Sequence, residues 1–145
     1  MPQSTRTLHR LVVSALGAAA IVGAFSLGAV LAQQPPAPKI TALMKQVIPE
    51  YPGHEVTMLT LDIPAGGGSA AHRHPGHHIF GYVLEGAYKI KLDDGPERTL
   101  TKGETFYEAP GQLHAVSRNA SETEPAKILV VVLAETGKPV TVLEP

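Results

Sequence analysis

Short strand-like runs separated by turn residues dominate the chain after residue 40. In residues 87–92, Tyr88, Ile90 and Leu92 alternate with lysines, the period of two expected for a strand with one buried face. Residues 55–63 repeat this alternation, and no segment after the N-terminal region has the spacing of an amphipathic helix. The pattern therefore predicts an all-β fold, an antiparallel sandwich or barrel.

Further strands are predicted from the apolar runs between the turns. Residues 79–84 join 87–92 through Glu85-Gly86, and a hairpin turn follows at 93–96. Residues 126–134 (AKILVVVLA) indicate a strand buried on both faces, and 138–143 a last short strand. Residues 41–48 are ambiguous, and we favour a strand. The predicted core consists of Leu59, Leu61, Ile63, Ile90, Leu92 and the run 128–133.

The first 32 residues have the pattern of an export signal. Arg6 and Arg10 precede an uncharged run, residues 11–32, which ends in the cleavage-site pattern Val30-Leu31-Ala32. The alternative is an uncleaved membrane anchor, because an apolar run of this length could just span a bilayer. We predict a signal peptide at 1–32, a Pro-rich linker at 33–39, one domain at 40–145, and a periplasmic or secreted location.

The composition of the remaining chain excludes several kinds of protein. It has ten basic and thirteen acidic residues, a formal charge of −3, which gives no electrostatic argument for a nucleic-acid partner. A membrane partner is expected only if the N-terminal segment stays attached. The chain has no cysteine, so disulfides and thiolate ligands are excluded. No Gly-rich stretch opens a helix, so no phosphate-binding loop for an organic cofactor is predicted.

Four histidines lie within the seven residues 72–78, in the segment HRHPGHH. On a strand, the spacing of His72 and His74 places both imidazoles on one face, where they can bind one ion. The Pro75-Gly76 turn then brings His77 and His78 back nearby, and a distant histidine, His114, begins another apolar strand. Neutral imidazole is a ligand for Zn, Cu, Fe and Ni. The alternative is that the histidines lie in a solvent-exposed loop that binds metal ions only weakly and nonspecifically.

Two longer stretches carry a family resemblance. Residues 66–86 (GGGSAAHRHPGHHIFGYVLEG) resemble the first cupin motif, with matches at Gly66, His72, His74 and Gly86. Residues 103–119 (GETFYEAPGQLHAVSRN) are similar to the second, and the matching positions there are Gly103, Pro110, Gly111, His114 and Asn119. The motifs occur in the expected order, separated by residues 87–102. The resemblance implies a six-stranded jelly-roll barrel with a metal inside it.

The resemblance also implies a ligand set, with one departure. Position by position, the family ligands are His72, His74 and His114, but the glutamate of the first motif is missing. His78 or Ile79 occupies its place. We favour His78 as a fourth ligand over His77, because neighbouring strand residues face opposite ways. The alternative is a three-histidine site with open positions. The metal is expected to be a divalent transition ion, Fe, Mn, Cu, Ni or Zn.

Other polar and aromatic residues receive weaker assignments. Glu104 and Glu108 are expected to be surface charges, although one could replace the missing carboxylate or act as a base. Tyr82 and Tyr107 are expected in the core, with cavity lining as the alternative. Arg73 should face away from the two histidines beside it. No catalytic residue is assigned.

Two classes of function follow. The first is an exported metal-dependent enzyme, most simply a small-molecule dioxygenase or isomerase. The second is a non-catalytic cupin module that binds a small ligand or the metal itself. A small-molecule partner is expected in both cases, and the apolar strands permit a homodimer. An open coordination position would favour the enzyme, and a closed four-histidine site the binding module.

Overall fold

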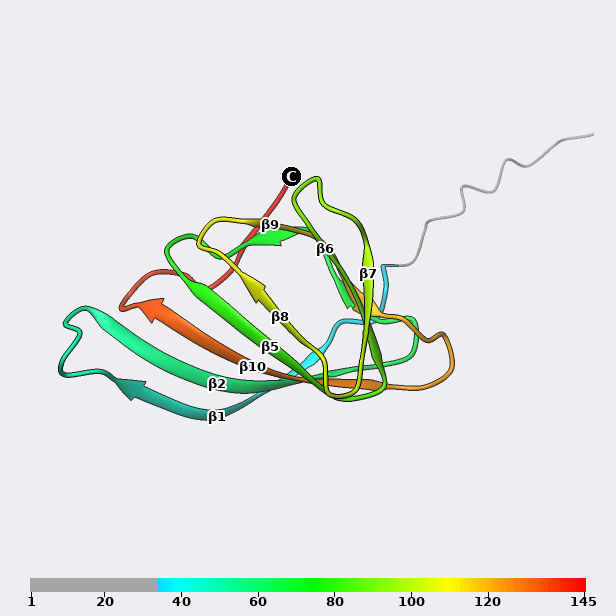
Figure 1. The fold of residues 1–145 in the computed structure, drawn as a ribbon, viewed down its shortest axis with the longest axis horizontal. Coiled ribbons are helices and arrows are strands. Elements are labelled where there is room, and N and C mark those ends of the chain that lie inside the picture. The colour runs from blue at the N-terminus through cyan, green and yellow to red at the C-terminus, as the bar shows by residue number, and fades with distance from the viewer. Residues whose placement is uncertain (1–33) are drawn as a thin grey trace, which may run out of the picture. The chain divides into compact units, whose positions relative to one another are not determined.

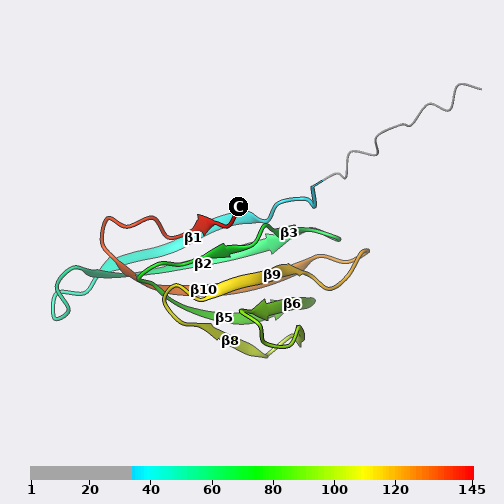
Figure 2. The same ribbon diagram turned by 90° about the horizontal axis from the view of Figure 1, so that it is seen from above.

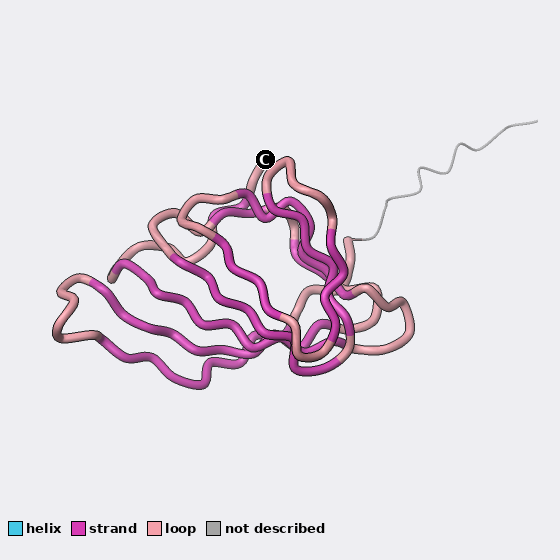
Figure 3. The backbone as a smooth tube through the Cα atoms, viewed as in Figure 1, coloured by secondary structure: helices cyan, strands magenta, loops and turns pink. Residues whose placement is uncertain are grey.

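The computed structural model describes residues 34–145, which contain strands and loops and no helix (Figure 3). The strands are β1 (Lys39–Val47), β2 (His54–Ile63), β3 (Gly68–Ser69), β4 (His72–Arg73), β5 (His78–Glu85), β6 (Ala87–Leu92), β7 (Arg98–Thr101), β8 (Thr105–Glu108), β9 (Leu113–Asn119), β10 (Ala126–Glu135) and β11 (Val142–Leu143). The ambiguous segment 41–48 therefore forms a strand, as predicted, whereas most of 138–143 is loop.

The strands form two antiparallel sheets. One has the order β1-β2-β10-β5-β8, and its strands lie side by side in Figure 1. The other has the order β11-β4-β9-β6-β7, with β3 also paired to β9. Figure 2 labels β3, β9 and β6 of this sheet. Nonconsecutive neighbours, such as β10 between β2 and β5, define a jelly roll rather than a meander. The predicted all-β antiparallel jelly roll is confirmed, although short additional strands raise the number within residues 34–145 from the expected six to eleven.

The core lies between the two sheets. Ile128, Val130 and Val132 of β10 point into it, because alternate residues of a strand face the same way. Ile63, Ile79, Val83, Tyr88, Ile90, Leu100, Phe106 and Ala134 complete the buried cluster, with Leu59, Leu61 and Leu92 packed against it. The predicted core is therefore largely correct. The prediction that β10 is buried on both faces is wrong, because residues 129, 131 and 133 lie half-buried on the outer face.

The outer face of the five-stranded sheet is rich in aromatic side chains. Phe80 and Tyr82 of β5 and Tyr107 of β8 are each exposed by more than 40%. The alternation that buries Ile79, Gly81 and Val83 turns their neighbours outward. The expectation that Tyr82 and Tyr107 pack in the core is therefore wrong, and neither lines the cavity described below. The homodimer stays a prediction.

Gly81 shapes the interior next to the candidate site. It pairs with Phe106 across β5 and β8, and a Cβ atom at this position would overlap the Phe106 ring. The missing side chain leaves room for this ring close to the β5 backbone, and the ring lines the cavity. Gly81 therefore determines the position of one cavity wall.

The N-terminal predictions fall largely outside the described part of the chain. The signal peptide, its alternative as an anchor and Gln33 at the start of the linker all belong to residues 1–33. Within residues 34–145, no helix is long and apolar enough to cross a bilayer.

Candidate metal centre

Three of the predicted histidines meet inside the barrel. His72 of β4 lies directly opposite His114 of β9, and His74 follows two residues later on the same face. One ring nitrogen of each lies within 4.8 Å of a ring nitrogen of the other two. Arg73, between them, faces away as predicted, and its guanidinium donates to Glu144 Oε1 (2.7 Å) and the Gly111 carbonyl (2.8 Å).

Backbone carbonyls determine which ring nitrogen carries the hydrogen in His72 and His74. The Nδ1 of His72 lies 2.7 Å from the Ala70 carbonyl, and that of His74 lies 2.6 Å from the Val140 carbonyl. A carbonyl oxygen can only accept, so each Nδ1 carries the hydrogen. In the neutral rings the lone pair is then on Nε2. This arrangement of outer hydrogen bonds is common for metal-binding histidines.

Burial favours the neutral form of His72. Its removal from water lowers the pKa of the imidazole below the usual 6.5, although the hydrogen bond to Ala70 opposes this shift. His114 and His74 add to the lowering, because three imidazoles this close cannot all be protonated cheaply. Neutral imidazole is the form that binds a metal.

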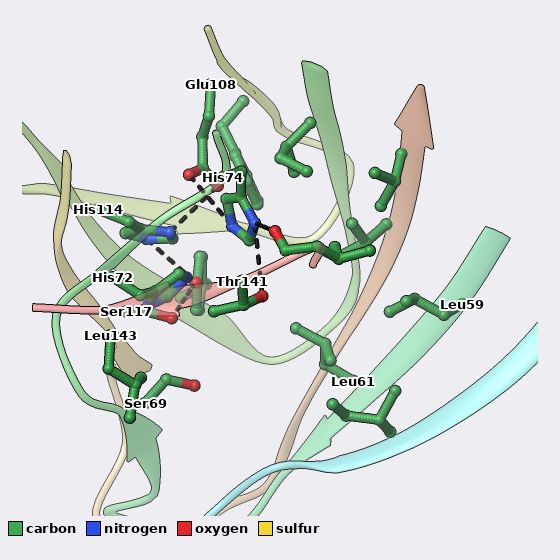
Figure 4. A pocket seen from close by; sticks show the side chains of 17 residues that line it. Leu59, Leu61, Ser69, His72, His74, Glu108, His114, Ser117, Thr141 and Leu143 are labelled. Atoms are coloured by element: carbon green, nitrogen blue, oxygen red, sulfur yellow. Dashed lines mark hydrogen bonds and ion pairs between the residues drawn. The ribbon is translucent and has the colours of Figure 1, made fainter. Parts of the chain in front are cut away.

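A buried carboxylate completes the cluster. Glu108, at the end of β8, is only 2% exposed. Its Oε1 lies 3.1 Å from His114 Nδ1, and its Oε2 lies 3.8 Å from His74 Nε2 (Figure 4). Neither Glu108 Oε2 nor His114 Nδ1 has a hydrogen-bond partner. The expectation that Glu108 is a surface charge is wrong, whereas Glu104 is exposed and caps Thr101.

Glu108 lies across the β5–β8 ladder from the position where this chain lacks the glutamate of the cupin motif. Ile79, one of the two residues at the motif's glutamate place, points inward and lines the cavity. Its partner across the ladder is Glu108. The carboxylate is therefore supplied by the neighbouring strand. The alternation in residues 105–108 could have indicated that Glu108 points inward, because it shares a strand face with the apolar Phe106.

The other two clustered histidines point elsewhere. His78 begins β5 on the outward face, and its Nδ1 lies 2.8 Å from the Tyr107 hydroxyl. It is not in the three-histidine group, although the sequence favoured it as a fourth ligand. His77 is fully buried, accepts a hydrogen bond from the Glu135 amide at Nδ1 and donates from Nε2 to the Pro139 carbonyl. Both nitrogens of His77 are thus already engaged.

A cavity of about 420 Å³ adjoins the histidines and Glu108. It is lined by Ile40, Leu59, Leu61, Ser69, His72, His74, Ile79, Tyr88, Phe106, Glu108, His114, Ser117, Val130, Val132, Val140, Thr141 and Leu143. Burial raises the pKa of Tyr88, whose hydroxyl lies 2.7 Å from Ser117 Oγ and 3.4 Å from His114 Nε2. In Figure 4, Leu59 and Leu61 lie across the cavity from the histidines.

The donor set fits a divalent transition ion. Three imidazoles and one carboxylate are ligands for Zn, Fe, Mn, Cu and Ni. The buried, unpartnered Glu108 Oε2 and His114 Nδ1 are costly without a cation. The protein is thus a jelly-roll barrel with three inward histidines that could hold a metal ion, and with a buried carboxylate beside them at an apolar cavity.

The cupin domain model matches residues 59–132, about half of the chain, and the chain belongs to this family. The match includes the whole histidine cluster. No curated protein matches.

Solved structures support the same fold. An uncharacterised conserved protein of Klebsiella pneumoniae with a double-stranded β-helix domain is 19% identical, with a TM-score of 0.60 over 75% of this chain and 85% of that one. The DMSP lyase DddQ of Ruegeria pomeroyi is 22% identical (TM-score 0.58, 81% and 55% covered). A recombinant oxalate oxidase in complex with glycolate is 24% identical (TM-score 0.58, 76% and 56% covered). This chain thus spans little more than half of the lyase and the oxidase.

Proposed function

We propose that this protein is an exported, metal-dependent cupin enzyme that oxidises or isomerises a small organic molecule. One divalent transition ion would be held by His72, His74 and His114, with Glu108 as the carboxylate. Export is inferred from the signal pattern of residues 1–32 alone. The bound ion would supply Lewis-acid or redox chemistry at the end of the cavity.

The observation that carries this proposal is the buried carboxylate beside three histidines at an accessible cavity. Glu108 is 2% exposed, and its Oε2 has no hydrogen-bond partner. His78 faces away, so the four side chains do not form the closed all-histidine site that would favour storage or sensing. The cavity leaves room for a small molecule next to the proposed ligands.

Residues of the chain would orient and protect such a molecule. The Tyr88 and Ser117 hydroxyls lie 2.7 Å apart in the cavity wall, and since one hydrogen is enough to join them, the pair can donate the other to a bound molecule. Glu108 is the nearest carboxylate for accepting a proton. The apolar walls would exclude water from the reacting groups.

A non-catalytic ligand-binding module is the second candidate. The observation in its favour is the scarcity of polar groups in the cavity walls: apart from the histidines and Glu108, only Tyr88, Ser69, Ser117 and Thr141 are polar. Such a wall can hold a ligand but offers few groups to act on it.

Metal analysis followed by turnover assays tests the proposal. The untagged protein is purified from its native compartment, and metal per chain is counted. Near-stoichiometric Fe, Cu, Mn or Ni supports the enzyme, and oxygen uptake is then screened with small organic substrates against a His72→Ala control. Stoichiometric Zn directs the screen to isomerisation. Metal far below one per chain that added ions do not restore would overturn the proposal. Full metal without turnover would support the binding module.

A further inference from the structure

The charges around the cavity restrict what it can bind. None of its lining residues is Lys or Arg, and Glu108 is the one acidic residue among them. With a divalent ion on three neutral imidazoles and this carboxylate, the formal charge at the buried end would be +1. A ligand with one negative charge would neutralise it, whereas a second charge would have no counterion. An uncompensated buried charge is strongly unfavourable.

The polar groups of the walls are too few for a polyol. The hydroxyls of Tyr88 and Ser117 are bonded to each other at 2.7 Å. The Thr141 hydroxyl lies 3.5 Å from His74 Nδ1. A sugar in this cavity would lose its hydrogen bonds to water without replacing most of them, and each such loss is costly.

The remaining wall is apolar, and much of it comes from β10, the central strand of the five-stranded sheet, and from its two neighbours β2 and β5. Leu59 and Leu61 of β2, Val130 and Val132 of β10, and Ile79 of β5 face the cavity. Leu59 and Leu61 lie across it from the histidines (Figure 4). A hydrocarbon body would bury its surface here while its head group reached the proposed ion. The volume of about 420 Å³ suits a small molecule.

We infer that the site takes small apolar acids, molecules with one anionic oxygen head group and a hydrocarbon body, and discriminates against dianions and sugars. This inference rests on the proposed metal site. The head group binds at the ion, and the body lies along Leu59, Leu61, Val130 and Val132.

Calorimetric titration of the Zn²⁺-loaded full chain with a homologous series tests the inference. The probes are propionate, butyrate, pentanoate and hexanoate, with adipate as hexanoate bearing a second carboxylate, and glucose as a polyol. Affinity should rise about three- to fourfold per methylene, the factor expected for burying one CH₂ group. Adipate should bind at least about tenfold more weakly than hexanoate, and glucose should not bind. Metal-free protein should bind none of the acids.

A matched pair of variants tests where the hydrocarbon body of the ligand binds. Val130 lines the cavity, whereas Val131, its neighbour in β10, faces outward. Val130→Thr keeps the volume but adds a hydroxyl to the wall, and should weaken hexanoate binding about fivefold. Val131→Thr should leave it unchanged. Neither change should alter Zn²⁺ affinity.

The outcomes separate the two proposals. An affinity independent of chain length, adipate as tight as hexanoate, glucose binding, or equal effects of the two Thr variants would overturn the inference while the metal site stands. Failure of the chain to bind Zn²⁺ or another transition ion would overturn the proposed function, and the inference with it.

Discussion

Replacing Glu108 with Gln removes a buried charge while nearly preserving the shape of the side chain. The carboxylate lies 3.1 Å from His114 Nδ1 and 3.8 Å from His74 Nε2. At a separation of about 4 Å and an effective dielectric constant of about 20, two unit charges interact by about 4 kcal/mol, and a divalent ion would double this. The amide oxygen of Gln offsets part of the loss. We expect Zn²⁺ affinity to fall at least 100-fold, about 2.7 kcal/mol.

The same change should stabilise the metal-free protein. Glu108 Oε2 and His114 Nδ1 are buried without hydrogen-bond partners, and such groups cost about 1–3 kcal/mol each. The amide of Gln can donate to His114 Nδ1, so the free energy of unfolding should rise by about 1–3 kcal/mol.

Competition titration with a chelator measures the Zn²⁺ affinity. Urea denaturation in the presence of the same chelator measures the free energy of unfolding of the metal-free protein. Glu104→Gln is the matched control, because Glu104 immediately precedes β8, the strand that carries Glu108, and is exposed; it should leave the affinity unchanged. Wild-type Zn²⁺ affinity in Glu108→Gln, or a metal-free variant less stable than the wild type, would refute the reasoning.

Four further predictions concern the histidines and the cavity wall. His72→Ala should abolish tight metal binding, whereas His78→Ala should keep the wild-type metal affinity. If His78→Ala lost as much metal affinity as His72→Ala, His78 would be a ligand after all. His77→Ala should keep the metal but lower the free energy of unfolding by about 1–3 kcal/mol, because the partners of both ring nitrogens lose their hydrogen bonds; unchanged stability in urea denaturation would contradict this. Gly81→Ala should destabilise the protein by about 1–3 kcal/mol, because its methyl group displaces the Phe106 ring; a stability equal to the wild type would show that the ring moves freely. The metal-free protein should lose stability as the pH falls below 6.5, because His72 is protonated at its usual pKa in the unfolded chain while burial lowers that pKa in the fold. In His72→Asn the free energy of unfolding should therefore fall less steeply between about pH 7.5 and 5.5. An unchanged slope would exclude His72 as the cause.

Alternation and turn residues were sufficient to predict the strands and much of the core. Tyr88, Ile90 and Leu92 alternate with lysines in β6, and Ile63 and Ile90 are buried as predicted. The pattern failed at β10, because an apolar residue on the outer face of a sheet looks the same in sequence as one in the core. Only the placement of a second sheet on one side distinguishes Val130 from its outward neighbours.

The histidine pair at 72 and 74 could be predicted to share a face, because the period of a strand is fixed by backbone geometry. The motif resemblance added His114. The direction of His77 and His78 could not be predicted, because the Pro75-Gly76 turn interrupts the alternation. Gly76 adopts a positive φ of 80°, and the His77 amide bonds back to the His74 carbonyl. This turn geometry resets the register and sends His78 outward.

The sequence by itself determined the all-β fold and the three inward histidines, since both follow from local periodicity and from motifs whose residues lie close together in the chain. Only the tertiary structure decided the fourth member of the cluster and the outer partners of the rings. Glu108 reaches the histidines because β8 pairs with β5 in a register that sets it opposite Ile79. His74 is oriented by the carbonyl of Val140, 66 residues away along the chain. Pairing between distant strands and the position of a backbone carbonyl depend on the packing of the whole barrel, and no local pattern of side chains encodes them.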